Sequence, residues 1–147
     1  MILDNQVLFS DAQAITAASL AASTNVIDLG APGSAAYNNV SLRRRMDKGH
    51  CPLLIQVVED FAGAATLINV KVQESVDAAF SSPVTLMEHD ILAADLVAGY
   101  ICPIDELPRN IEKRYIRIAY TPDGIQTAGK FTSGIVAAID SGYKGNN

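Results

Sequence analysis

The chain has 147 residues, a formal net charge of −5, 49% hydrophobic residues and only 18% charged residues. This length suits one domain with a core of its own, and the composition excludes intrinsic disorder as the main state. The acidic balance argues against a globally basic nucleic-acid binder, and the chain shows neither a signal-peptide pattern nor an apolar run approaching the roughly 18 residues of a membrane span. We therefore expect a single domain over residues 1–147, made in the cytosol, without direct nucleic-acid or membrane contact.

The N-terminal part contains an alanine-rich segment, Asp11–Ala22, that supports two interpretations. Alanine propensity and an N-capping aspartate favour a helix. No apolar stripe runs along the segment, however, so an extended arm is an equal alternative. A short strand is expected after it, at Val26–Leu29.

A long basic loop is expected from Gly30 to His50, the longest irregular stretch of the chain. Loops of this length in compact domains tend to be functional or disordered. Its cationic side chains are candidate contacts to an acidic protein surface, because a guanidinium fork pairs well with carboxylates. A solvated loop is the plainer alternative. The candidate contact residues are Arg43, Arg44, Arg45 and Lys48.

A period of two dominates the rest of the chain and predicts strands with one apolar and one polar face. The expected strands are Leu53–Val58, Thr66–Glu74, Tyr115–Thr121 and Phe131–Ile139, with shorter ones at Val84–Met87 and Gly99–Ile104. Turn signals separate them: Ala62–Ala65 indicates a hairpin or tight connection, and Thr121–Gly124 is a turn sequence. Glu88–Ala98 is left open between a short helix capped by Asp90 and a loop. This pattern predicts an all-β antiparallel sandwich or barrel.

Residues able to carry chemistry are few. Cys51 and Cys102 are expected to be free thiols, because the chain shows no export signal. His50 beside Cys51 supplies at most half of a zinc site. The adjacent pairs Glu59–Asp60 and Asp105–Glu106 should point to opposite faces of a strand, which disfavours an acid/base dyad. We therefore expect no enzymatic activity, no cofactor and no metal.

Several short segments, which follow one another in a particular order along the chain, together resemble a known family. The segments are Phe9–Thr16, Ser23–Gly30, Pro52–Val57, Gly63–Leu67, Asp77–Ser82, Leu96–Tyr100, Glu112–Ile118 and Thr127–Lys130. Together they resemble the capsid cement (decoration) proteins of tailed bacteriophages, in particular the Bbp16-like family. The resemblance implies a jelly-roll-like β-sandwich, an extended conformation for Asp11–Ala22 and no enzymatic activity.

The same resemblance implies a structural role on the virion. Cement proteins of this kind sit on the exterior of an icosahedral head and bridge neighbouring major capsid subunits, which stabilises the shell against internal DNA pressure. The expected partners are the major capsid protein and further copies of the chain, with dimers favoured over trimers. The alternative function is a β-sandwich ligand-binding module of a virion, for a carbohydrate or a receptor. The lack of Trp argues against a sugar platform, although tyrosines could form one. These are Tyr37, Tyr100, Tyr115 and Tyr143.

Overall fold

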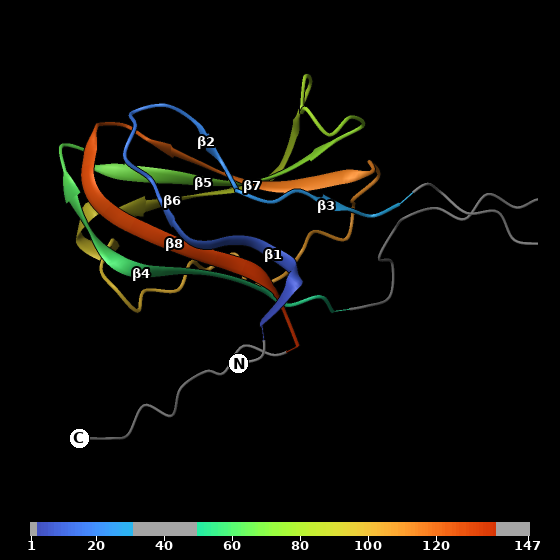
Figure 1. The fold of residues 1–147 in the computed structure, drawn as a ribbon, viewed down its shortest axis with the longest axis horizontal. Coiled ribbons are helices and arrows are strands. Elements are labelled where there is room, and N and C mark those ends of the chain that lie inside the picture. The colour runs from blue at the N-terminus through green and yellow to red at the C-terminus, as the bar shows by residue number, and fades with distance from the viewer. Residues whose placement is uncertain (1–2, 31–49, 138–147) are drawn as a thin grey trace, which may run out of the picture.

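The computed structural model describes residues 3–30 and 50–137, which form two antiparallel sheets packed as a sandwich (Figure 1). Sheet A has the order β1 (Leu3–Ala14), β8 (Gln126–Val136), β4 (Leu53–Gly63). Sheet B has the order β2 (Ala21–Ala22), β7 (Tyr115–Pro122), β5 (Leu67–Ser75), β6 (Val84–Leu92), and β3 (Ile27–Asp28) also pairs with β7. The predicted all-β antiparallel sandwich is confirmed.

The core lies between the two sheets and follows the alternation in the sequence. On β5 the apolar side chains of Ile68, Val70 and Val72 are fully buried, and on β7 those of Ile118 and Tyr120 are fully buried as well. Removing such side chains from water contributes about 1.5–3 kcal/mol each, which explains why the two-residue period fixes these strands. The predicted strands over residues 66–74 and 115–121 are thus confirmed almost to the residue.

Residues 11–22 form no helix, because strand residues at 11–14 and 21–22 flank a bend at 17–19; the helical alternative is wrong, and both ends of the segment are extended as the family resemblance implies. β1 continues to Ala14 along β8, with Ser10 opposite Ser133 and Gln13 opposite Phe131. Ile15 is fully buried, and its amide donates to the carbonyl of Gly129. Pairing with a distant strand and burial in the core outweigh the small helix preference of alanine, which is worth less than about 1 kcal/mol per residue.

Residues 88–98 form neither of the two expected structures. Strand β6, predicted for residues 84–87 only, continues to Leu92 because it stays paired with β5 as far as Leu67. A single 3-10 turn, η1 (Ala93–Asp95), follows. No helix in the described part of the chain is both long and apolar enough to cross a membrane.

Residues 99–104 do not form the predicted strand, since only Ile101 makes an isolated bridge, to Gln56. The segment nevertheless runs along the free side of β4. The amide of Val57 donates to the carbonyl of Tyr100 at 2.9 Å, and that of Cys102 donates to the carbonyl of Ile55 at 2.8 Å. The apolar pattern of residues 99–104 therefore indicated a segment that packs against β4 but does not itself form a regular strand.

The connection around Gly63 is tight, but it is not a hairpin, because β4 belongs to sheet A and β5 to sheet B. Gly63 has a φ of +151°, and a Cβ there would lie 2.4 Å from the carbonyl oxygen of Ile125. A Cβ at Gly124 would lie 2.8 Å from the backbone of Ala64. The two turns that carry the chain between the sheets therefore pack backbone against backbone, which requires glycine at both positions.

Candidate functional site

The predicted contact residues Arg43, Arg44, Arg45 and Lys48 lie outside the described residues. The structure does describe the residues on both sides of this basic segment. In Figure 1 the described chain ends after β3 and resumes before β4 at the same end of the sandwich. The ordered contacts at these two points are therefore the natural place to look for a binding surface.

The first of these points is held by a bidentate ion pair. The Arg114 guanidinium donates from Nε and Nη2 to the two carboxylate oxygens of Asp28, both at 2.7 Å. This hydrogen bonding raises the pKa of Arg114. The amide of Gly30 also donates to Asp28, at 2.8 Å, and the amide of Leu29 donates to the carbonyl of Arg114. The pair fixes the chain on β7 directly before the basic segment begins.

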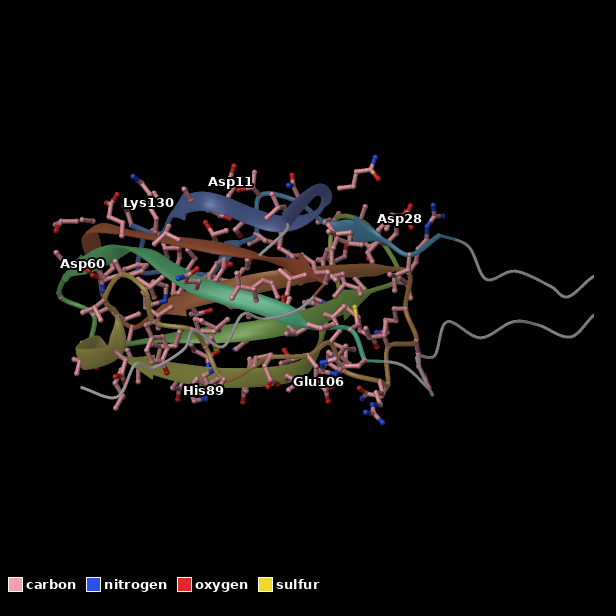
Figure 2. The ribbon with its side chains drawn as sticks, turned by 90° about the horizontal axis from the view of Figure 1, so that it is seen from below. Asp11, Asp28, Asp60, His89, Glu106 and Lys130 are labelled. Carbon is pink, nitrogen blue, oxygen red and sulfur yellow. The ribbon has the colours of Figure 1, made fainter. Side chains whose placement is uncertain are left out.

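The second point is held by His50 and Glu106. Nδ1 of His50 lies 2.9 Å from a carboxylate oxygen of Glu106, and both side chains are exposed to solvent. Next to them the amide of Leu107 donates to the carbonyl of Cys51, and Pro52 bridges to Glu106. Both boundaries of the basic segment thus carry an acidic residue from the ordered domain, Asp28 on one side and Glu106 on the other (Figure 2).

Neither contact could be predicted from the sequence. Asp28 and Arg114 are 86 positions apart, and His50 and Glu106 are 56 apart. Neither pair follows a local spacing rule of a helix or hairpin. Only the packing of β3 beside β7, and of residues 99–107 beside β4, brings these side chains together.

The tyrosines proposed for a ligand platform are distributed over both sheets. Tyr115 begins β7 in sheet B, with the Arg114 guanidinium 5.1 Å from its ring centroid. Tyr100 lies in the segment beside β4 of sheet A. Tyr37 and Tyr143 lie outside the described residues. Of the four candidates, the structure thus describes Tyr100 and Tyr115, which lie on elements of different sheets.

A half-buried polar cluster lies at the end of β5. Arg117 Nε donates to Gln73 at 2.9 Å, and the guanidinium sits 4.2 Å from the centroid of the Phe80 ring. Burial lowers the pKa of Arg117. The neighbouring Glu74, 4% exposed, accepts from the amides of Glu112 and Lys113. Each polar group here has a partner within the fold, so the cluster positions the loop before β7.

Of the adjacent carboxylates, Glu59 and Asp60 lie in β4, whereas Asp105 and Glu106 lie outside the strands, so the expectation for a strand does not apply to them. Glu59 pairs with Lys130 at 2.5 Å, which lowers the pKa of Glu59, whereas Asp60 accepts from the amide of Ala98 at 2.7 Å. The two side chains thus bind different partners. Cys51 and Cys102 are free thiols, and burial raises the pKa of both. Within residues 3–30 and 50–137, no group of three or more His, Cys, Asp or Glu residues is placed to hold a metal ion.

The comparisons with known proteins identify one family. A search of curated proteins found no match. The family model of Bbp16 matches residues 9–135, which include every described strand except the first residues of β1 and the last of β8. A match over this length covers most of the chain and both sheets. The chain therefore belongs to the Bbp16 family.

Proposed function

We propose that this protein is a virion structural protein that binds the outer surface of an assembled icosahedral phage head and bridges neighbouring major capsid subunits. The observation that carries the proposal is membership of the Bbp16 family over residues 9–135, together with the resemblance of the sequence to phage cement proteins. In this role the protein acts as a homo-oligomer, with dimers favoured. It stabilises the shell by binding, without catalysing a reaction.

Mass action explains how such a protein strengthens a shell. A ligand that binds only the assembled state stabilises that state by RT ln(1 + [L]/Kd), about 2.7 kcal/mol per site when the free protein is a hundredfold above Kd. The many equivalent sites of a symmetric shell multiply this modest free energy. A cement protein therefore needs a stiff body and reproducible contact surfaces more than it needs a deep pocket.

The architecture supports this role. Two sheets with long-range pairing make a stiff body, and the turns that join them are interlocked through Gly63 and Gly124. The Asp28–Arg114 ion pair and the His50–Glu106 contact hold the described chain on both sides of the basic segment. A stiff body joined to a segment rich in arginine can bridge acidic surfaces on neighbouring subunits.

The proposal is tested by adding the purified protein to emptied, undecorated phage heads and imaging them by electron cryomicroscopy. We expect ordered density on the outer surface, over the junctions between major capsid subunits, and a higher temperature of head disruption. Bare heads at saturating protein would refute the proposal. A glycan array on the same protein tests the alternative, and specific sugar binding would favour the ligand-binding module.

A further inference from the structure

Strand β6 is the long sheet edge that the described fold leaves open. Within residues 3–30 and 50–137 it pairs with β5 alone. The other edge strands either are short or accept hydrogen bonds from a neighbouring segment. Residues 99–107 hydrogen-bond along β4, the amide of Asn25 donates to the carbonyl of Phe9 on β1, and β2 and β3 are two residues each. An unpaired edge of this length is a template for another strand.

The part of β6 best suited to pairing is residues 87–92, which we call the β6 edge. Its register with β5 runs without a shift from Val72 opposite Met87 to Leu67 opposite Leu92. The irregularity lies on the other side, between Val72 and Gln73. The β6 edge contains neither a proline nor a β-bulge, so the charges of Glu88 and Asp90 are what protects it from unselective pairing.

The outer face of the β6 edge is acidic. Glu88 and Asp90 point to the same face, because they pair with Lys71 and Asn69 on the face opposite to the buried Val70 and Val72. Lys71 lies 3.9 Å from Glu88, whose side chain is 61% exposed, and Asn69 donates to Asp90 at 2.6 Å. The pairing with β5 therefore leaves the acidic face of the edge open to solvent.

This charge pattern disfavours pairing with a second copy of the chain about the middle of the edge, at residues 88–90. In an antiparallel pair related by a two-fold axis, residues on the same face oppose each other. Centring the pair on His89 sets Glu88 against Asp90 of the other copy, and centring it on Glu88 or Asp90 sets that carboxylate against itself. Like charges directly opposite each other destabilise a strand pair. A partner strand with cations at alternate positions removes this repulsion.

We propose that the β6 edge accepts an extended strand from a protein partner that carries Lys or Arg at alternate positions, opposite Glu88 and Asp90. Main-chain hydrogen bonds to the edge supply affinity, and the two carboxylates select a basic strand. If the partner is the major capsid protein, the inference rests on the proposed function and specifies one of its contacts. The edge site itself does not require that identity.

The first test uses a short synthetic peptide that alternates lysine with valine, and a matched peptide that alternates glutamate with valine. Hydrogen exchange is measured on the full chain with each peptide. We expect the lysine peptide to slow exchange of backbone amides within residues 87–92 and the glutamate peptide to leave them unchanged. Slowed exchange only outside β6, equal effects of both peptides, or no effect of the lysine peptide would overturn the proposal.

The second test uses the double variant Glu88→Gln/Asp90→Asn, whose amides keep the shape of the carboxylates. The matched control, Asp11→Asn/Asp95→Asn, changes the net charge equally. Asp11 lies on the opposite side of the sandwich from His89 of β6 (Figure 2). We expect the edge variant to bind the lysine peptide about tenfold more weakly and the control to match the wild type.

The same variants on emptied heads separate this inference from the proposed function. If decoration weakens in the edge variant alone, the β6 edge contacts the shell. If the wild type leaves heads bare but still binds the lysine peptide at β6, the capsid role fails and the edge site stands. If all variants decorate equally and none binds the peptide, the edge proposal is wrong and the capsid role stands.

Discussion

At the scale of single residues, the feature that ties the two sheets together is the buried hydroxyl of Tyr120. This side chain of sheet B lies 3.0 Å from the hydroxyl of Ser10 and 2.8 Å from that of Ser133, both in sheet A. Its ring stacks on Phe131, with 4.7 Å between the centroids. All four residues are fully buried. These three hydrogen-bonded hydroxyls inside an apolar core fix how the two sheets are aligned, in addition to holding them in contact.

We predict that Tyr120→Phe destabilises the protein by about 1–3 kcal/mol, because it removes the shared partner of two buried hydroxyls. Urea denaturation followed by far-UV circular dichroism measures the effect. Adding Ser133→Ala to Tyr120→Phe should recover part of the loss, since an apolar pair leaves fewer buried polar groups without a partner.

Tyr115→Phe is the control for this prediction, because Tyr115 lies at a partly exposed strand end rather than in the core. We expect a change within about 0.5 kcal/mol for it. Equal stabilities of the two tyrosine variants would show that the Tyr120 hydroxyl does not hold the sheets together.

Burial also predicts an effect at alkaline pH. The pKa of Tyr120 is raised to about 12. The phenol therefore loses its proton in the unfolded chain at lower pH than in the folded protein. Stability should be unaffected by this group below pH 10 and fall between pH 10 and about 12. A Tyr120→Phe protein should lose this part of the alkaline decline in a urea series.

At the scale of elements, the two turns between the sheets are joined by one carboxylate. Oδ1 of Asp123, in the turn after β7, accepts from the amides of Thr66 at 2.7 Å and Leu67 at 3.1 Å, at the start of β5. The Thr66 hydroxyl donates to Oδ2, the other carboxylate oxygen of Asp123. These hydrogen bonds to the ionised form lower the pKa of Asp123.

We predict that this turn contact weakens in acid. Asp123 has a lowered pKa in the folded state, so its contribution is complete above the ordinary value of 3.8 and is lost as the pH falls below it. In urea denaturation, Asp123→Ala should be less stable than the wild type at neutral pH, and the gap should narrow near pH 3. A gap that stays constant over this range would contradict the assignment.

Asp123→Asn serves as the matched comparison, because its amide oxygen can still accept from Thr66 and Leu67 but it does not titrate. This variant should fall between the wild type and Asp123→Ala at neutral pH. Its stability relative to Asp123→Ala should not depend on pH.

The elements that the sequence predicted well are those whose burial alternates. β5 and β7 lie in the middle of sheet B, with a core on one face and solvent on the other, so their apolar residues recur every second position. β6 was predicted too short, because an edge strand is exposed on more sides and its burial pattern is irregular. Residues 88–92 carry two acidic residues and a histidine, and their pairing with β5 alone makes them a strand.

At the scale of the whole molecule, charge is distributed unevenly. The net charge is −5, yet three of the chain's arginines stand together at residues 43–45. The described residues on either side of residues 31–49 are held by the contacts Asp28–Arg114 and His50–Glu106. An acidic body with one basic segment is oriented by the field of an acidic surface and binds it in a salt-dependent way.

We predict that Arg43→Ala/Arg44→Ala/Arg45→Ala weakens attachment to emptied heads at moderate salt while the fold persists. Co-sedimentation with heads measures occupancy, and circular dichroism checks the fold. Lys71→Ala/Lys113→Ala/Lys130→Ala removes the same charge from the ordered domain and should have a smaller effect. Unchanged occupancy of the arginine variant would exclude these residues as capsid contacts.

The all-β class, the central strands and the family could be predicted from the amino-acid sequence, because they depend on local alternation and on segments in a fixed order. The jelly-roll connectivity that the family resemblance implies stays a prediction. The strands that share each sheet, the separation of β4 from β5 at Gly63 and the open edge of β6 became known from the folded structure. Burial produces a repeating pattern in neighbouring residues, whereas strand pairing joins residues far apart in the chain and produces no such pattern.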